Sequence, residues 1–369
     1  MASKKVNRIG LQESLVDHLL KNNITTCQDL LCKNSVELLS ILGVSLRQVE
    51  EVVLKTSEAC APESQTALQL KKRFTQDQPG YIATTLESID TALHGGLQVG
   101  TITEIAGPSG CGKTQFCMML TVQAMLPSRS GGLNGAVAYI DTESAFSATR
   151  LVQIARSKYP NHFTSDKEFL RLVNNVYVYQ QTTCTSLLNR LETFEYEVIT
   201  KGIKLIILDS VASLVRKEFD IRLQGNFLKR TNLLAKEAAI LKNLAENLSI
   251  PVIVTNQITT RQGSTNQSSN QEQTRPFDSG EGQVTAALGN TWSHSVNTRL
   301  LLQYHDAVIR QVLIAKSPVA PFTSVKYTIL DKGIVAEPTD QETYYQGTDP
   351  GLQSLKVRSS LAYEISHQL

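Results

Sequence analysis

The sequence has few cysteines and no long apolar run, and each absence excludes a class of protein. No apolar stretch approaches the roughly 20 residues that span a bilayer. The first residues, Met1–Val6, include lysines but no apolar segment typical of a secretion signal. The six cysteines include no C-x-x-C pair, which argues against a zinc site or a disulfide framework. We therefore expect no membrane span, and a protein from a reducing compartment.

The chain also lacks a strong excess of charge of either sign. It has 36 basic and 34 acidic residues, a formal net charge of +2. This is too small to indicate nucleic-acid binding by itself. The 41% apolar and 19% charged residues are ordinary for a globular protein. At 369 residues, the chain can form two domains or one large α/β domain with an appendage.

The most informative stretch is Gly107–Thr114, which reads Gly-Pro-Ser-Gly-Cys-Gly-Lys-Thr. It matches the phosphate-loop pattern G-x-x-x-x-G-K-[ST] at each fixed position. Residues 101–106 before it predict a strand and residues 115–125 after it predict a helix. In this context backbone N–H groups bind phosphate at a helix N-terminus. Lys113 is expected on the β and γ phosphates and Thr114 on Mg²⁺. The predicted nucleotide contacts in this stretch are Gly107, Pro108, Ser109, Gly110, Cys111, Gly112, Lys113, Thr114 and Gln115.

Residues 8–58 predict a helical module, because leucines and valines recur at helical spacing. Turns are expected at 22–23 and 43–45, with Ser45 as a helix N-cap. Segment 34–45 has the shape of a helix-hairpin-helix, in which N–H groups near the hairpin glycine can bind a DNA phosphate. Within residues 4–58, seven basic residues are offset by seven acidic ones. DNA contact and protein contact or plain packing therefore both remain open.

Residues 59–80 predict a linker, because they are polar and contain two prolines. Their basic cluster 71–73 is consistent with a nuclear address or with a solvated face. The predicted domains are a helical domain over 1–58, the linker over 59–80, a core over 81–338 and a tail over 339–369. The tail has little apolar pattern, and we expect it to be poorly ordered.

The core alternates between predicted strands and helices. Buried strands are expected over 135–140, 176–179, 204–209 and 251–255, helices over 185–200 and 228–247, and hairpins joining 298–304 to 310–315 and 326–330 to 333–336. This alternation predicts an α/β fold with a mostly parallel, twisted sheet covered on both faces. Polar residues follow the strands, at the edge where open α/β sheets bind ligands.

Three polar residues at strand ends can complete an ATP-hydrolysing site. Asp209 follows four aliphatic residues and is expected to hold Mg²⁺, although it could instead cap the next turn. Glu143 can polarise the attacking water, or serve as a cap or ion-pair partner. Gln257 can report the γ phosphate, because an amide both donates and accepts hydrogen bonds. A structural hydrogen bond explains Gln257 equally well.

Two segments after strand ends are predicted to be mobile loops, 215–229 and 259–282. The first carries Arg216 and Arg222 among its basic residues. The second has only Arg261 and Arg275. We therefore expect a purely electrostatic grip on nucleic acid to be weak.

Taken in order, the motifs of the chain resemble the RecA-type recombinase core. They are Thr84–Asp90, Leu93–Gly96, Thr103–Ile105, the phosphate loop, Tyr139–Glu143, Leu208–Ser210, Thr255–Gln257, Gly289–His294 and Thr298–Leu300. With its helical N-terminal module, the chain is similar to the eukaryotic Rad51 branch and, among the Rad51 paralogues, fits the B type best. The resemblance covers residues 1 to about 338.

The resemblance implies a RecA-like P-loop ATPase core, with ATP and Mg²⁺ as cofactors and a helix-hairpin-helix-like N-terminal domain. It assigns the metal to Thr114 and Asp209, and catalysis to Glu143, Lys113 and Gln257. Arg150 matches an arginine that lies against adenine, and His294 a histidine that senses the γ phosphate of the neighbouring subunit.

The resemblance also assigns the segments that face DNA and the neighbouring subunit. Segments 215–229 and 259–284 match the two DNA-facing loops. The candidate DNA-binding residues are Arg216, Arg222, Arg261 and Arg275. Lys316–Pro318 matches a cap over the neighbour's nucleotide, although the filament-forming recombinases usually have an acidic residue at Lys316.

One departure from the family pattern concerns the assembly of subunits. Ser64–Ala67 occupies the place of the Phe-x-x-Ala anchor through which recombinase subunits polymerise, and Ser64 cannot fill an apolar pocket. The resemblance thus implies a DNA-dependent ATPase subunit of a nuclear Rad51-paralogue complex. The C paralogue is the expected direct partner, and through it the chain would contact the Rad51 recombinase. The complex would assist the recombinase filament on single-stranded or branched DNA. The alternatives are a self-sufficient strand-exchange recombinase and a scaffold with structural ATP.

Overall fold

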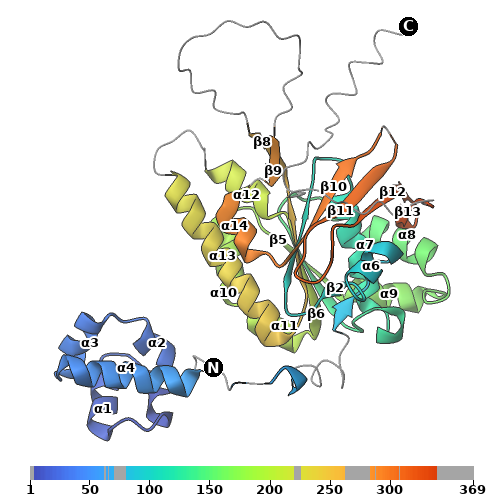
Figure 1. The fold of residues 1–369 in the computed structure, drawn as a ribbon. Helices are drawn as coiled ribbons and strands as arrows, with labels where there is room; N and C mark the ends of the chain where they lie inside the picture. Colours follow the sequence, from blue (N-terminus) through green and yellow to red (C-terminus); the bar gives the residue numbers. More distant parts are fainter. Residues whose placement is uncertain are drawn as a thin grey trace, which may run out of the picture. The chain divides into compact units, whose positions relative to one another are not determined.

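The structure is a computed structural model. It describes residues 4–61, 64, 66–69, 80–219, 226–261, 283–286, 288–306 and 308–338. These fall into two compact units, one within residues 1–73 and the other within 74–369 (Figure 1). Most of the predicted linker and the whole predicted tail, 339–369, lie outside the described residues.

The N-terminal unit is helical, as predicted. It contains η1 (Val6–Arg8), α1 (Glu13–Lys21), α2 (Cys27–Leu31), α3 (Ser35–Leu42) and α4 (Leu46–Cys60). Leu19, Leu38 and Val49 are fully buried in its core. Gly43 ends α3 in the left-handed conformation, with φ of 64°, which glycine adopts without strain. The predicted N-cap Ser45 is confirmed: its hydroxyl accepts from the Gln48 backbone N–H.

The larger unit is built on a nine-stranded sheet with the order β13-β12-β11-β10-β3-β7-β6-β4-β5. These strands are β3 (Ile102–Ala106), β4 (Ala136–Asp141), β5 (Val176–Gln180), β6 (Ile203–Asp209), β7 (Val252–Asn256), β10 (Thr298–Tyr304), β11 (Arg310–Lys316), β12 (Ser324–Leu330) and β13 (Gly333–Ala336). From β10 to β5 the neighbours run parallel, whereas β10 to β13 are antiparallel. The predicted mostly parallel sheet is confirmed, and so are the two hairpins.

Helices cover both faces of this sheet (Figure 1). On one side lie α6 (Glu87–Ala92), α7 (Lys113–Met125), α8 (Ala148–Lys158) and α9 (Asp166–Asn174). On the other lie α10 (Cys184–Glu192), α11 (Phe194–Thr200), α12 (Val211–Glu218), α13 (Asn226–Leu248) and α14 (Gly289–Ser295). A short pair, β1 (Tyr81–Ile82) with β2 (Leu97–Gln98), flanks the core.

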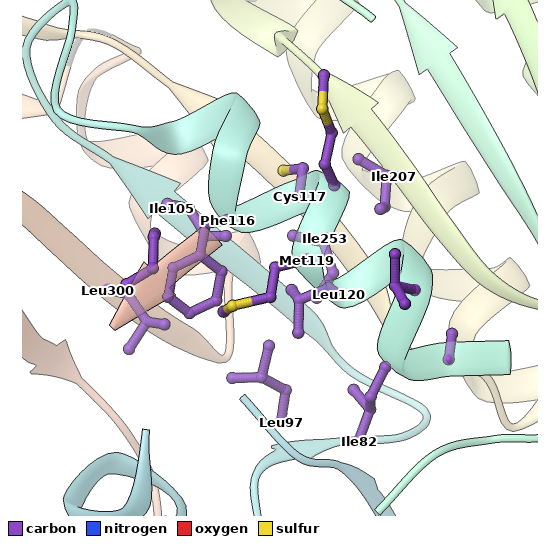
Figure 2. Packing of buried hydrophobic residues seen from close by; sticks show 14 of the residues in the cluster. Ile82, Leu97, Ile105, Phe116, Cys117, Met119, Leu120, Ile207, Ile253 and Leu300 are labelled. Atoms are coloured by element: carbon purple, nitrogen blue, oxygen red, sulfur yellow. The ribbon is translucent and has the colours of Figure 1, made fainter. Parts of the chain in front are cut away.

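Strand alternation explains the continuous apolar runs in the sequence. In β6, Leu205 and Ile207 pack on the α7 side, whereas Ile206 and Leu208 pack on the α13 side. Both faces of the strand are therefore buried, as expected of a parallel sheet between helical layers. Figure 2 shows Phe116 of α7 beside Ile105 and Leu300 of the sheet. This packing fixes the start of α7 against β3 and β10.

The structure differs from the sequence-based expectation at helix 185–200, which divides at Thr193 into α10 and α11. The Thr193 hydroxyl donates back to the carbonyls of Asn189 and Arg190. A β-branched residue that bonds to the preceding turn in this way weakens a continuous helix.

The predicted loop 215–229 is also shorter than expected, because α12 extends through Glu218 and α13 begins at Asn226. Leu214 and Val215 are buried, which stabilises the end of α12 against the sheet. In the second predicted loop, β8 (Ile258–Arg261) pairs with β9 (Gln283–Ala286). Residues 220–225 and 262–282 lie outside the described part. Among the described helices, none is long and apolar enough to cross a membrane.

Candidate nucleotide-binding site

The predicted phosphate loop connects β3 to α7, and its glycines meet specific conformational demands. Gly110 and Gly112 have φ angles of 79° and 98°, in the region that favours glycine. At Gly107, a Cβ atom would lie 2.4 Å from the Leu302 carbonyl oxygen. Helix α7 starts directly after Gly112 and has no acidic residue in its first turn. The loop and helix therefore form a site suited to an anion.

The antiparallel strands hold the carbonyl groups of this loop. The Tyr327 hydroxyl donates to the Cys111 carbonyl at 2.6 Å, and the Tyr304 hydroxyl donates to Ser109 at 3.1 Å. Arg310 Nε donates to the Gly110 carbonyl at 3.3 Å. Sequence reasoning missed all three donors, because they lie about 200 residues after the loop and belong to no motif.

Two side chains of the loop are shielded from solvent. Burial raises the pKa of the Cys111 thiol to about 11, so this cysteine fills space as a neutral group. Lys113 Nζ donates to the carbonyls of Gly107 and Pro108, both at 3.0 Å. Burial lowers the pKa of Lys113, and the Asp209 and Glu143 carboxylates act in the opposite direction. The two hydrogen bonds hold Nζ beside the loop.

Asp209 lies at the carboxyl end of β6, where it is buried and contacts the predicted second metal residue. Thr114 Oγ1 donates to its Oδ2 at 2.8 Å, and the Tyr139 hydroxyl donates to the same oxygen at 2.7 Å. Thr255 Oγ1 donates to Oδ1. Burial and the Asp209 charge raise the pKa of Tyr139 well above its ordinary value, so Tyr139 remains a donor.

The hydrogen bonds described for the Asp209 carboxylate come from side-chain hydroxyls, and its role as a metal ligand stays a prediction. The capping role belongs to Asp141 at the end of β4, which accepts from the backbone N–H groups of Glu143, Ala145 and Phe146. Within the described residues, no group of three or more His, Cys, Asp or Glu side chains could hold a metal ion. A hydroxyl and one carboxylate fit Mg²⁺ bound together with phosphate oxygens.

Glu143 and Gln257 come together on the exposed side of the site. Glu143 Oε1 accepts from Ser210 Oγ at 2.6 Å and from Gln257 Nε2 at 3.3 Å. Gln257 Oε1 in turn accepts from Arg216 Nη1. Two of the three predicted catalytic residues, Glu143 and Gln257, thus form one hydrogen-bonded group with Arg216, a residue that the resemblance assigned to DNA.

Arg150 lies on α8 and contacts the phosphate-loop helix. Its Nε donates to Gln115 Oε1 at 2.7 Å, and its Nη2 donates to the Leu330 carbonyl at 2.6 Å. Its Nη1 donates to Gln153 Oε1 at 2.7 Å. Arg150 borders an open pocket of about 600 Å³ together with residues of the β12–β13 turn. The predicted contact of Arg150 with adenine stays a prediction.

The residues expected to face a neighbouring subunit lie apart from this group. His294 is exposed on α14 and makes no hydrogen bond to the other candidate residues within the described part of the chain. Lys316 Nζ binds the end of α14, donating to the Ser293 carbonyl at 2.9 Å and the Val296 carbonyl at 2.5 Å. The lysine at this position therefore holds the helix that carries His294.

A buried polar network joins α14 to strands β3 and β10. No role for this network was predicted from the sequence. Glu104 of β3 accepts from Asn256 Nδ2 at 2.6 Å and from Trp292 Nε1 at 3.0 Å. It also pairs with Arg299 of β10. The network joins the strand before the phosphate loop to Asn256, the neighbour of Gln257. The signal available in the sequence was a charged residue inside an otherwise uncharged strand.

The candidate DNA-binding residues are only partly within the described structure. Arg216 lies on α12, and Arg261 is the last residue of β8. Arg222 and Arg275 lie outside the described residues. Their predicted role stays a prediction.

Comparison with known proteins adds to this geometry. Residues 78–337 match the Rad51 family, and residues 6–60 match the XRCC3/RpoA-like helix-hairpin-helix domain. The human protein named DNA repair protein RAD51 homolog 2 is 53% identical over 348 residues, which cover 92% of this chain and 90% of the human one. The mouse protein of that name is 50% identical, covering 91% and 99%. The one from Arabidopsis thaliana is 30% identical, covering 97% and 96%.

These matches extend over both units, and the phosphate loop, Asp209 and the mostly parallel sheet agree with them. The resemblance inferred from the ordered motifs is confirmed, and the chain belongs to the Rad51 family.

Proposed function

We propose that this protein is a DNA-dependent ATPase subunit of a Rad51-paralogue complex, which assists assembly or stabilisation of the recombinase filament in homologous recombination and double-strand-break repair. The observation that carries the proposal is the phosphate loop with Thr114 hydrogen-bonded to Asp209 at 2.8 Å. Its relatives in human and mouse are named as DNA repair proteins, which supports the repair role.

In this proposal the chain binds ATP through the loop N–H groups and Lys113. Thr114 and Asp209 would hold Mg²⁺, which neutralises phosphate charge when bound. Glu143 orients water, Gln257 holds the Glu143 carboxylate, and Arg150 lies against the base. Protein groups that are already oriented before the reaction lower its barrier without reorganising during it.

The partner is proposed to be another Rad51 paralogue, with the C paralogue as the direct contact and a nuclear location. The exposure of Glu143 and His294 supports a partner at the nucleotide site, because a second protein can reach both side chains. Ser64 in place of an aromatic anchor favours a mixed complex over a long filament of this chain alone. Single-stranded or branched DNA is the proposed nucleic-acid partner, with Arg216, Arg222, Arg261 and Arg275 as candidate contacts.

The test is nucleotide binding by the full-length chain, alone and mixed with candidate paralogues, in wild type and Lys113→Ala. The variant is expected to lose at least a hundredfold in ATP affinity, because it lacks the Lys113 amino group that lies against the loop. The native mass with ATP should show a mixed complex. Wild-type protein that binds no Mg–ATP in any pairing would refute the proposal, and filaments of the pure chain on DNA would favour a self-sufficient recombinase.

A scaffold with structural ATP is the remaining alternative. It predicts tight ATP binding without turnover. Single-turnover hydrolysis, measured with and without single-stranded DNA, separates it from the proposed function: stimulation by DNA supports an ATPase, and retained, unhydrolysed ATP supports a scaffold.

A further inference from the structure

Arg216 makes two hydrogen bonds within the chain, which a residue that only contacts DNA would not require. It lies on α12, the helix that follows Asp209. Its Nη1 donates to Gln257 Oε1, and its Nη2 donates to the Ile258 carbonyl at 3.3 Å. One guanidinium thus binds both a side chain and the backbone at the junction of β7 and β8.

These contacts determine which way the Gln257 carboxamide points. A guanidinium has only donors, and a carboxylate has only acceptors. The carboxamide oxygen must therefore face Arg216, and its NH₂ group must face Glu143, as observed. A reversed amide would lose both hydrogen bonds.

The same contacts reach the carboxylate expected to orient water. Gln257 Nε2 and Ser210 Oγ both donate to Oε1 of Glu143, at 3.3 and 2.6 Å. Two donors on one oxygen restrict rotation of the carboxylate. Arg216 is also within electrostatic range: partial desolvation of its guanidinium and the Arg230 charge lower its pKa, and the Glu143 charge raises it.

We propose that Arg216 is a positioning residue for ATP hydrolysis, which acts through Gln257 on Glu143. This inference rests on the proposed ATPase function. It gives Arg216 a role in the absence of DNA, different from the role as a DNA contact that the sequence predicted. A phosphate contact alone would affect DNA affinity and leave DNA-free turnover intact.

The test compares Arg216→Ala, Arg216→Lys and Lys217→Ala in the full-length chain. Lys217 is the matched control, because it is an exposed cation on the same helix. DNA-free kcat of Arg216→Ala is expected to fall roughly tenfold to a hundredfold, with KM for ATP changed by less than about twofold. Arg216→Lys should recover part of the loss, because an ammonium lacks the planar fork that reaches both oxygens. Lys217→Ala should turn over at the wild-type rate.

A double-mutant cycle tests whether the effect passes through Gln257. If it does, adding Arg216→Ala to Gln257→Ala causes no further loss of DNA-free kcat, whereas independent effects multiply. Multiplied effects would overturn the inference. So would wild-type DNA-free turnover in Arg216→Ala, with or without weaker DNA binding. A wild-type chain that hydrolyses no ATP would refute the proposed function as well, which distinguishes the two failures.

Discussion

The two halves of the candidate site differ in the burial of their side chains and in the partners of their hydrogen bonds. The phosphate half consists of the loop, Thr114 and Asp209, and its polar atoms bind partners from strands β4, β7, β10 and β12. The water half consists of Glu143, Gln257 and Arg216, of which Glu143 and Arg216 are exposed. Its three residues are joined to one another by hydrogen bonds between their long side chains, from Arg216 to Gln257 and from Gln257 to Glu143.

This difference separates binding from hydrolysis. Buried hydrogen bonds that are all satisfied give a rigid site, since breaking one leaves an unpaired group in the interior. Exposed side chains lose rotamer freedom when they are ordered, so each contact between them is worth less. We expect changes in the phosphate half to affect binding and stability, and changes in the water half to affect turnover.

The largest effect should come from Glu143→Gln. Removing the carboxylate that orients water is expected to lower hydrolysis by about a hundredfold to ten-thousandfold and leave ATP affinity nearly unchanged. Single-turnover hydrolysis and equilibrium ATP binding measure the two quantities. Glu195→Gln, an exposed acidic residue on α11, is the control. Turnover at the wild-type rate would show that Glu143 is not the carboxylate that orients the attacking water.

The next effect concerns stability and depends on pH. Glu237 of α13 is fully buried, and neither carboxyl oxygen has a hydrogen-bond partner. Burial raises its pKa from 4.5 to about 8, and the Glu218 charge adds to this. The folded chain therefore binds this proton more tightly than the unfolded chain, and the free energy of unfolding falls as pH rises between these values.

Glu237→Gln removes this titration, because its amide resembles the protonated carboxyl. The variant should match wild type near pH 5 and be more stable by about 2–4 kcal/mol near pH 8. Thermal unfolding at the two pH values measures the difference, with Glu246→Gln on the same helix as the control. Parallel pH profiles for variant and wild type would contradict the assignment. Turnover should change little, since Glu237 belongs to the helical layer.

A smaller effect is expected from Tyr327→Phe, which tests the phosphate half. The change removes the hydroxyl that binds the Cys111 carbonyl at 2.6 Å and leaves the ring in place. The loss should be about 1–2 kcal/mol. ATP affinity should fall several-fold as the loop loosens, which titration with a fluorescent nucleotide can measure. Tyr196→Phe, whose side chain is 75% exposed, is the control. Unchanged affinity would mean that the loop needs no support from β12.

The smallest effect should come from Lys316→Met, which keeps the length of the side chain but removes its charge. Two carbonyl groups at the end of α14 would lose their donor, at a cost of about 1 kcal/mol. A lower melting temperature, compared with that of the exposed control Lys242→Met, measures this. A variant as stable as wild type would indicate that Lys316 is not needed to hold α14.

Much of the site was predictable because its signals are local. A glycine loop between a strand and a helix, and an acid after four aliphatic residues, occupy a few consecutive positions. The hydroxyl donors of Tyr304 and Tyr327 were not predictable, since they reach the loop only after the antiparallel strands have formed. Helix α12 was missed because its buried residues are apparent only once the sheet face is known.

The sequence by itself determined the nucleotide loop, the alternation of strands and helices, and the family. Only the tertiary structure decided that Thr114 reaches Asp209, that Glu104 supports α14, and that Arg216 binds Gln257. The physical reason is that short motifs encode backbone conformation, whereas contacts between distant side chains depend on strand order and register, which sets the carboxyl ends of β4, β6 and β7 side by side.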